Sequence, residues 1–198
     1  MKFFIENYVQ MKEFLEEIFI HKANFTQIKI GYSDKKKIQD SALTLLNLKD
    51  FGQLRDRYEG EMFYKRFTRE LMAEIALEKY LGIKFINWVA KSKIRDFPNR
   101  LVYDNLFVGL TVVDFAEFPI LIDEDVTIPQ IFCISKGGDV IYICGVATKD
   151  ILLQNQKDIS SRPMALGKKV IFTGIKYLLK FDSVQSLEEI LNKTESHI

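Results

Sequence analysis

Three carboxylates in the middle of the chain have the residue types and the order that a divalent-metal site requires. Glu74 lies in a long amphipathic segment, Asp104 follows apolar residues 101–103, and Asp114 follows apolar residues 110–113. Mg²⁺ prefers hard oxygen ligands, usually one or two carboxylates with water and substrate completing its shell. An ion held in this way can polarise a phosphate and activate water. Glu74, Asp104 and Asp114 are therefore candidate ligands for Mg²⁺ or Mn²⁺ and candidate catalytic residues.

The segment that carries Glu74 is predicted to be a helix from about residue 61 to residue 81, with Gly82 as its C-terminal stop. Its apolar residues recur at four-residue steps, which is typical of one helix face: Phe63, Phe67, Leu71 and Ile75. Glu74 lies near the edge of this face. The pattern is therefore compatible with a metal ligand and also with an ordinary surface acid.

Asp104 and Asp114 are predicted to lie on two successive strands joined by a turn at residues 105–109. Asp114 belongs to a largely buried strand, and a buried acid needs a partner or a metal. Asp104 is followed by Asn105, and these two residue types are favoured in turns. Asp104 can thus be interpreted as a ligand or as a turn residue.

Short β-rich segments after Gly82 predict a sheet, at residues 84–90, 100–108, 110–118, 128–135 and 139–147. Gly137 and Gly138 predict a hairpin turn, and Thr148 is a candidate helix N-cap. A last strand is expected at residues 170–172. A closing helix is expected at residues 183–191, with Ser186 and Glu189 in capping-box spacing.

Residues 61–180 resemble the PD-(D/E)XK nuclease superfamily, which includes restriction endonucleases and archaeal Holliday-junction resolvases. The resemblance rests on the order of the helix AEIALEKYLG, the strand pair LVYDNLFVGLTVVDF, the hairpin IFCISKGGDVIYICG and the helix start ATKDIL. It implies an α/β fold with a restriction-endonuclease-like mixed central sheet flanked by helices. It also implies a DNA-processing protein, a Mg²⁺-dependent deoxyribonuclease whose metal is held by Glu74, Asp104 and Asp114.

The chain departs from the superfamily pattern at the motif lysine. The family has Asp/Glu-x-Lys where this chain has Asp114-Phe115-Ala116, so the catalytic lysine is not carried over. Lys91 or Lys93, on the segment before the strand pair, would replace it if its side chain reached the site.

Two alternatives to an active nuclease remain open. The first is a catalytically inactive nuclease-like module that binds nucleic acid or a protein partner, which the alanine at position 116 favours. The second is a small α+β interaction protein unrelated to nucleases, with Asp114 satisfied by internal hydrogen bonds.

Positive charge is concentrated in two segments, residues 84–100 and 149–180, on either side of an acidic centre at residues 101–148. The net charge of the whole chain is only +1, so a nucleic-acid surface would have to be a local patch. Contacts to a DNA backbone are expected from seven residues of the basic segments: Lys84, Arg95, Arg100, Lys149, Arg162, Lys168 and Lys169.

Residues 1–58 are predicted to form a helical N-terminal extension ahead of a nuclease-like α/β core at residues 59–198. Apolar residues from Phe4 to Phe19 recur at three- and four-residue steps and predict an amphipathic helix of about five turns. Its Phe-rich face would dock a second copy, forming a homodimer, or a protein partner.

Composition disfavours several other classes. The two cysteines are too few for a disulfide scaffold or a four-cysteine zinc site, and their apolar surroundings predict buried thiols. Phosphate-binding glycine loops, a GxSxG elbow and an HExxH motif do not occur in the sequence. Apolar runs of membrane-spanning length and the core of a signal peptide are also missing, so a soluble, intracellular, cytoplasmic protein is expected.

Overall fold

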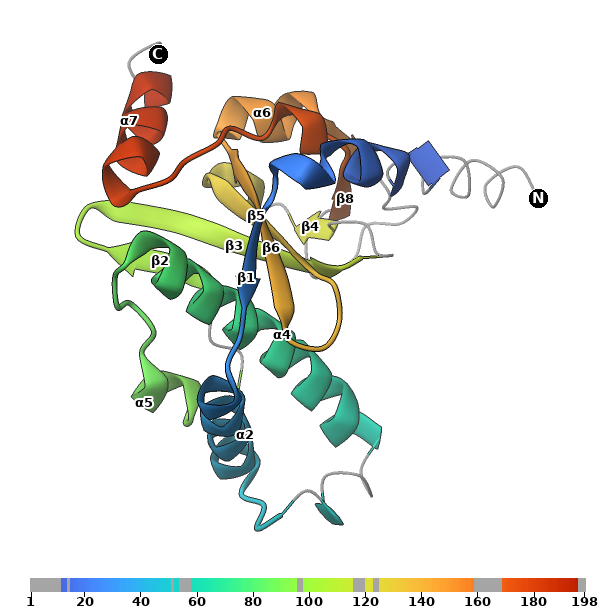
Figure 1. Ribbon diagram of the computed structural model, residues 1–198, viewed down its shortest axis with the longest axis vertical. Coiled ribbons are helices and arrows are strands. Elements are labelled where there is room, and N and C mark those ends of the chain that lie inside the picture. The colour runs from blue at the N-terminus through green and yellow to red at the C-terminus, as the bar shows by residue number, and fades with distance from the viewer. Residues whose placement is uncertain are drawn as a thin grey trace.

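The fold is a mixed α/β arrangement in which helices flank a five-stranded mixed sheet, as a computed structural model shows (Figure 1). The structure describes residues 12–13, 15–50, 52–53, 58–95, 98–115, 120–122, 125–158 and 169–195. Among these residues, no helix has the length and apolar character needed to cross a membrane.

The main sheet has the strand order β1-β6-β5-β3-β2. Strands β3 and β5 are parallel, and every other neighbouring pair in this sheet is antiparallel. A second sheet, of three strands, has the order β4-β8-β7. The strands are β1 Thr26–Lys29, β2 Arg100–Tyr103, β3 Leu106–Asp114, β4 Ile120–Ile122, β5 Gln130–Ser135, β6 Val140–Ala147, β7 Gln156–Asp158 and β8 Lys169–Phe172.

The α-helices with described bounds are α2 Tyr32–Leu46, α4 Tyr58–Leu81, α5 Trp88–Lys91, α6 Lys149–Gln154 and α7 Val184–Glu195. Short 3-10 turns occur at Lys22–Asn24, Asp125–Thr127 and Ile175–Tyr177. Residues 15–21 are also helical, whereas residues 1–11 and 14 of the predicted N-terminal helix lie outside the described residues.

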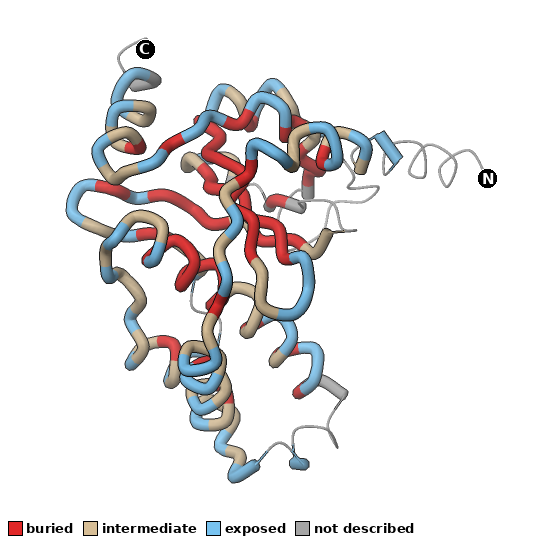
Figure 2. The backbone as a smooth tube through the Cα atoms, viewed as in Figure 1, coloured by how far each residue is buried: buried red, intermediate tan, exposed pale blue. Residues whose placement is uncertain are grey.

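Two hydrophobic clusters occupy the two faces of the main sheet. On one face, α4 packs against alternate residues of β3, such as Val108 and Leu110, and α2 packs against α4 in turn. On the other face, Phe132 of β5 stacks on Phe172 of β8, with ring centroids 4.4 Å apart. Because side chains alternate across a strand, β3 serves both clusters. Figure 2 shows the buried residues concentrated in the sheet and along the sheet-facing part of α4.

The strand β1 lies within the predicted N-terminal extension, yet it pairs with β6 as the edge strand of the main sheet. Ile38 and Ala42 of α2 belong to the same cluster as α4. Residues 26–46 are thus part of the structural core that α4 and the sheet form.

Several local signals act as predicted. Gly82 follows α4 with φ +69°, and Gly137 and Gly138, at φ +89° and +64°, turn the chain between β5 and β6. The Thr148 hydroxyl accepts a hydrogen bond from the Ile151 N–H and caps α6. Left-handed backbone is tolerated best by glycine, and a hydroxyl satisfies an orphan donor at a helix start.

Three local expectations are wrong. Residues 84–90 form no strand: Asn87 accepts a hydrogen bond from the Ala90 N–H and caps the single-turn helix α5, which overrides β propensity. The closing helix is capped by reciprocal hydrogen bonds between Ser183 and Ser186, not by Ser186 and Glu189. The turn between β2 and β3 consists of residues 104–105, because Tyr103 pairs with Leu106 and residues 106–109 belong to β3.

Candidate functional site

Glu74 is buried in the middle of α4, although the sequence also allowed a surface position. Residues 71–78 of this helix are all buried, because the sheet covers one side and α2 and α5 lie against the others. Lys91, the last residue of α5, donates a hydrogen bond from Nζ to Glu74 Oε1 at 2.6 Å. The side chains of Glu74 and Lys91 are only 2% and 5% exposed, so the two charges form a buried ion pair.

Burial raises the pKa of Glu74 to about 7, despite the opposing effect of the Lys91 ammonium. Desolvation disfavours the charged form of a carboxyl group, and the neighbouring acids Glu70 and Glu78 add repulsion in the same direction. The second carboxylate oxygen, Oε2, is buried without a hydrogen-bond partner among the described residues. Glu74 is therefore a carboxyl group poised between its charged and neutral forms near neutral pH.

Asp114 ends β3 on the face that α4 covers. Arg69 of α4 donates from Nη1 to Asp114 Oδ2 at 3.1 Å, and the exposed Lys65 Nζ lies 4.0 Å from the same oxygen. Both partners of the Arg69–Asp114 pair are partly exposed. Both positive partners of Asp114 therefore come from α4, where Arg69 lies five residues and Lys65 nine residues before Glu74.

Asp104 lies at the opposite end of β3, in the turn that precedes it. The nine residues of β3 separate it from Asp114 by about 25 Å at the usual rise per residue. Its backbone has φ +47°, the left-handed conformation that Asp tolerates better than most residues, and its side chain is exposed. The interpretation of Asp104 as a turn residue is the one that this geometry supports.

The three candidate ligands are therefore not brought together. Among the residues that the structure describes, no three His, Cys, Asp or Glu side chains are grouped so that they could hold a metal ion. Glu74 already has a buried ammonium at hydrogen-bond distance, and Asp104 lies a full strand length from Asp114. These residues do not fit the Mg²⁺ or Mn²⁺ site that the sequence resemblance implies.

The remaining predicted residues lie in several places. Lys93 is exposed in the turn after α5, Lys84 is exposed and pairs with Glu78 at 2.8 Å, and the Arg95 guanidinium lies 5.3 Å from the Phe63 ring centroid. Lys169 lies in β8, but its side chain is not described. Ala116, Arg162 and Lys168 lie outside the described residues.

Two of the predicted DNA contacts, Arg100 and Lys149, border one region on the other face of the sheet. The Arg100 guanidinium on β2 lies 5.2 Å from the ring centroid of Phe107 on β3. Phe107 and Lys149, the first residue of α6, line the same cavity of about 420 Å³. One residue of the first basic segment therefore lies beside an aromatic ring that is 47% exposed, and one residue of the second lines the cavity that this ring borders.

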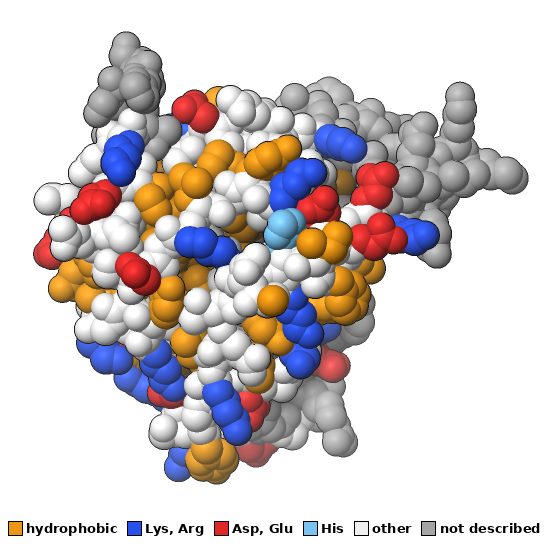
Figure 3. All heavy atoms as spheres, turned by 45° about the horizontal axis from the view of Figure 1, so that its top comes forward, with side chains coloured by type: hydrophobic (Ala, Val, Ile, Leu, Met, Phe, Trp, Pro, Cys, Tyr) orange, Lys and Arg blue, Asp and Glu red, His pale blue; other side chains and the backbone are white. Residues whose placement is uncertain are grey.

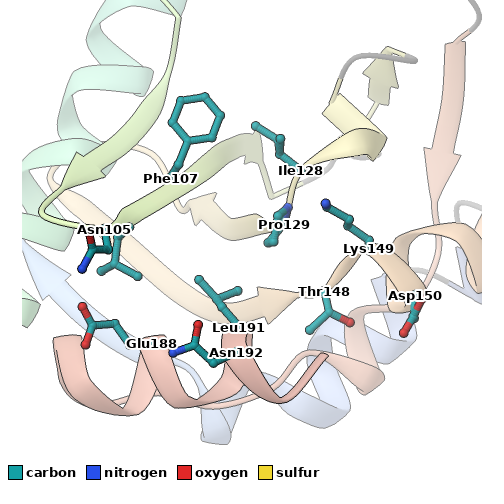
Figure 4. A pocket seen from close by; sticks show the side chains of 11 residues that line it. Asn105, Phe107, Ile128, Pro129, Thr148, Lys149, Asp150, Glu188, Leu191 and Asn192 are labelled. Carbon is teal, nitrogen blue, oxygen red and sulfur yellow. The ribbon is translucent and has the colours of Figure 1, made fainter. Parts of the chain in front are cut away.

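The walls of this cavity come from the β2–β3 turn, from the segment before β5, from the start of α6 and from α7. Figure 4 shows Glu188, Leu191 and Asn192 projecting from α7 toward the turn that carries Asn105. Ile128 and Pro129 form the wall beside Lys149. Cavities of this size are typical of small-molecule sites.

Charge is otherwise dispersed over the face shown in Figure 3, where Lys and Arg side chains occur singly or in small groups among acidic and apolar ones. An interface with a polyanion on this face would therefore depend on local groups of cations and not on one continuous basic surface. The cysteines offer no alternative chemistry, since Cys133 and Cys144 are free and buried as predicted, and burial raises the pKa of both thiols.

Sequence reasoning missed Arg69, Phe107 and the cavity residues of α7. Arg69 and Asp114 are 45 residues apart, and no local pattern connects them. Phe107 could have been found by its alternation with buried Leu106 and Val108, which places it on the opposite face of β3. Asn192 and Glu188 stand four residues apart, which places them on one side of a helix.

Comparisons with protein-family models, with curated proteins and with solved structures gave no match. The case for a function therefore depends on the geometry above.

Proposed function

We propose that this protein is a nuclease-like α/β module that binds nucleic acid without hydrolysing it. The observation that carries the proposal is the buried Lys91 ammonium, 2.6 Å from Glu74 Oε1. A divalent cation held by Glu74 Oε1 would have to displace this ammonium. An internal lysine in place of the metal holds α5 against α4 and supplies no activating ion.

The same proposal assigns the main sheet to the restriction-endonuclease-like fold. Supporting features are the long helix α4 across one sheet face with its buried acid, the β2–β3 hairpin, and the parallel neighbour β5. The sequence resemblance over residues 61–180 has this order of elements.

Binding of nucleic acid is supported by the cations that flank the cavity. Arg100 and Lys149 are separated by 49 positions in the sequence; Arg100 lies beside the exposed ring of Phe107, and Lys149 lines the cavity that Phe107 also lines. A guanidinium and an ammonium bind phosphate oxygens, while an exposed ring offers a surface on which a base can stack. Acids in the same region limit nonspecific attraction, which is consistent with a small net charge.

A binding assay tests the proposal directly. The affinity of the full chain for labelled single-stranded and duplex DNA would be measured by fluorescence anisotropy over a series of salt concentrations. Affinity should fall linearly in the double-logarithmic plot, and Arg100→Gln combined with Lys149→Gln should lower the slope by about 1 to 2. Lys65→Gln is the control variant: it also removes a positive charge, but on the opposite face of the sheet. It should leave the slope nearly unchanged.

A cleavage assay tests the second half of the proposal. The same DNA substrates would be incubated with the protein and either Mg²⁺ or Mn²⁺, with Asp114→Ala as the paired variant. No cleavage is expected from either protein. Metal-dependent cleavage that disappears in Asp114→Ala would establish an active nuclease and overturn the proposal.

A further inference from the structure

The cavity between the β2–β3 turn, α6 and α7 combines three kinds of surface within a volume of about 420 Å³. One part is apolar, one part carries side-chain amides, and one part carries charges of both signs. Such a mixture indicates a ligand that itself has an apolar part, a hydrogen-bonding part and a charged part. A purely apolar ligand would leave the polar groups unsatisfied, and a simple anion would meet acidic side chains at the same site.

The apolar part is formed by Phe107, Ile128, Pro129 and Leu191. Phe107 is 47% exposed, although its neighbours Leu106 and Val108 are buried. In Figure 4, Leu191 extends from α7 into the space between Pro129 and the β2–β3 turn. A ring stacked on an aromatic side chain such as Phe107 is well accommodated whatever its substituents.

The amide part consists of Asn105 in the turn and Asn192 on α7. An asparagine side chain presents one acceptor and two donors in a plane, the pattern that matches the edge of a nucleobase. Both amides belong to elements that frame the cavity from one side, opposite Lys149 (Figure 4).

The charged part contains Lys149 and Asp150 at the start of α6 and Glu188 on the wall that α7 forms. An ammonium is a suitable partner for a phosphate group, and a carboxylate accepts hydrogen bonds from sugar hydroxyl groups. Arg100, whose guanidinium lies 5.2 Å from the Phe107 ring centroid, adds a second cation beside the cavity. Base, sugar and phosphate thus each find a group of suitable chemistry within a single cavity.

We propose that this cavity binds one nucleotide unit, with its base against Phe107 and Leu191 and its phosphate at Lys149. The unit is either a free nucleoside monophosphate or the terminal nucleotide of a strand. In the second case the inference rests on the proposed function and specifies which part of the nucleic acid this protein recognises.

The first experiment uses the full chain and isothermal titration with the four ribonucleoside 5′-monophosphates. Adenosine, ribose 5-phosphate and inorganic phosphate are the separate probes for base, sugar phosphate and anion. Phe107→Ala should weaken nucleotide binding by about tenfold or more, since stacking on one aromatic residue contributes this much. Lys149→Gln should weaken binding of the monophosphates and leave adenosine unchanged.

Tyr177→Ala is the matched control. Tyr177 is also about half exposed, at 51%, and also has a cation near its ring, with Lys176 Nζ 5.4 Å from the centroid, but it lies outside this cavity. The proposal predicts wild-type affinity for this variant. Equal losses in Phe107→Ala and Tyr177→Ala would overturn it, and so would inorganic phosphate that binds as tightly as the nucleotides.

A second experiment distinguishes the two sources of the nucleotide. Linear single-stranded DNA with a 5′-phosphate would be compared with circular single-stranded DNA of equal length. A preference for the linear form that Phe107→Ala removes would assign the cavity to strand ends, whereas saturable binding of mononucleotides with equal affinity for both DNA forms would assign it to free nucleotides. Salt-sensitive DNA binding without nucleotide binding would refute this inference and leave the proposed function standing. Nucleotide binding without DNA binding would refute the proposed function and leave the nucleotide cavity standing.

Discussion

The two ends of β3 show opposite ways of arranging polar groups. At the Asp114 end, each acid is close to a cation of the same chain: Arg69 contacts Asp114, and Lys91 contacts Glu74 farther along α4. At the Leu106 end, polar and charged side chains line an open cavity of about 420 Å³. Acids that contact internal cations serve the fold, while side chains that line a cavity face a space large enough for a ligand.

Because of this difference, the candidate for a functional site is the Leu106 end of β3 and not the Asp114 end. The sequence directs attention to carboxylates, because acids at these positions resemble a metal site. The structure shows that Glu74 is held by a buried lysine and that the cavity with the exposed aromatic ring lies at the other end. Changes at the first end should therefore affect stability, and changes at the second end should affect binding.

The largest effect is expected from Lys91→Met, which leaves Glu74 buried without its cation. At pH 8, where Glu74 is ionised, the free energy of unfolding should fall by about 3–5 kcal/mol. At pH 5 the loss should be smaller, because Glu74 is then protonated. Urea unfolding monitored by the fluorescence of Trp88 measures both values.

Two further variants complete this test. Lys93→Met removes an exposed lysine two positions away and should change stability by less than about 0.5 kcal/mol. Glu74→Leu combined with Lys91→Met should recover most of the loss, since apolar replacement of a whole buried pair is often neutral. A double variant as unstable as Lys91→Met alone would show that the ion pair itself holds α5 in place.

The second prediction concerns pH. The folded-state pKa of Glu74 is about 7 and its ordinary value is 4.5, so the folded protein retains this proton while the unfolded chain releases it between these two pH values. Stability therefore decreases as pH rises from 4.5 to 7, and the penalty is complete above pH 7. At about 1.4 kcal/mol per pKa unit, it amounts to about 3 kcal/mol.

The measurement compares the wild type with Glu74→Leu/Lys91→Met, which lacks both side chains of the ion pair. The difference between their free energies of unfolding should shift by about 3 kcal/mol against the wild type between pH 4.5 and pH 8. A constant difference would mean that Glu74 titrates near its ordinary pKa.

The third prediction contrasts the two ion pairs. Arg69→Met should lower the free energy of unfolding by about 1 kcal/mol, less than Lys91→Met, because Arg69 and Asp114 keep 22% and 30% of their side-chain surface exposed. Added salt screens exposed charges with a Debye length of about 3 Å at 1 M. The loss in Arg69→Met should shrink between 50 mM and 1 M NaCl, while that in Lys91→Met stays constant; equal responses to salt would remove the distinction between the two pairs.

Local signals were sufficient to predict most of the elements. The helix that ends at Gly82, the glycine hairpin at residues 137–138 and the cap at Thr148 depend on nearby residues only, and each was predictable. Residues 84–90 were misjudged, because the side chain of Asn87 caps a helical turn against the β propensity of its neighbours.

The candidate site was less predictable, because its geometry depends on distant contacts. From the sequence, Lys91 was a candidate only if its side chain could reach the acidic site, and the sequence does not give that distance. The burial of the Glu74–Lys91 pair follows from how α5 and the sheet enclose α4. The cavity combines the β2–β3 turn with α7, which are about 85 positions apart in the chain. No periodicity within one element contains that information.

The smallest effect is expected at the turn, from Asp104→Gly. Because Asp104 has φ +47°, glycine can adopt its conformation without strain, and stability should stay within about 0.5 kcal/mol of the wild type. Asp104→Val is the matched variant and should cost about 1 kcal/mol or more, since a branched side chain is strained in the left-handed region. The two urea midpoints, measured with and without Mg²⁺, separate the two roles of Asp104. A turn residue predicts midpoints ordered by backbone strain and indifferent to Mg²⁺. A metal ligand predicts that Mg²⁺ raises the wild-type midpoint and that both variants lose this response equally.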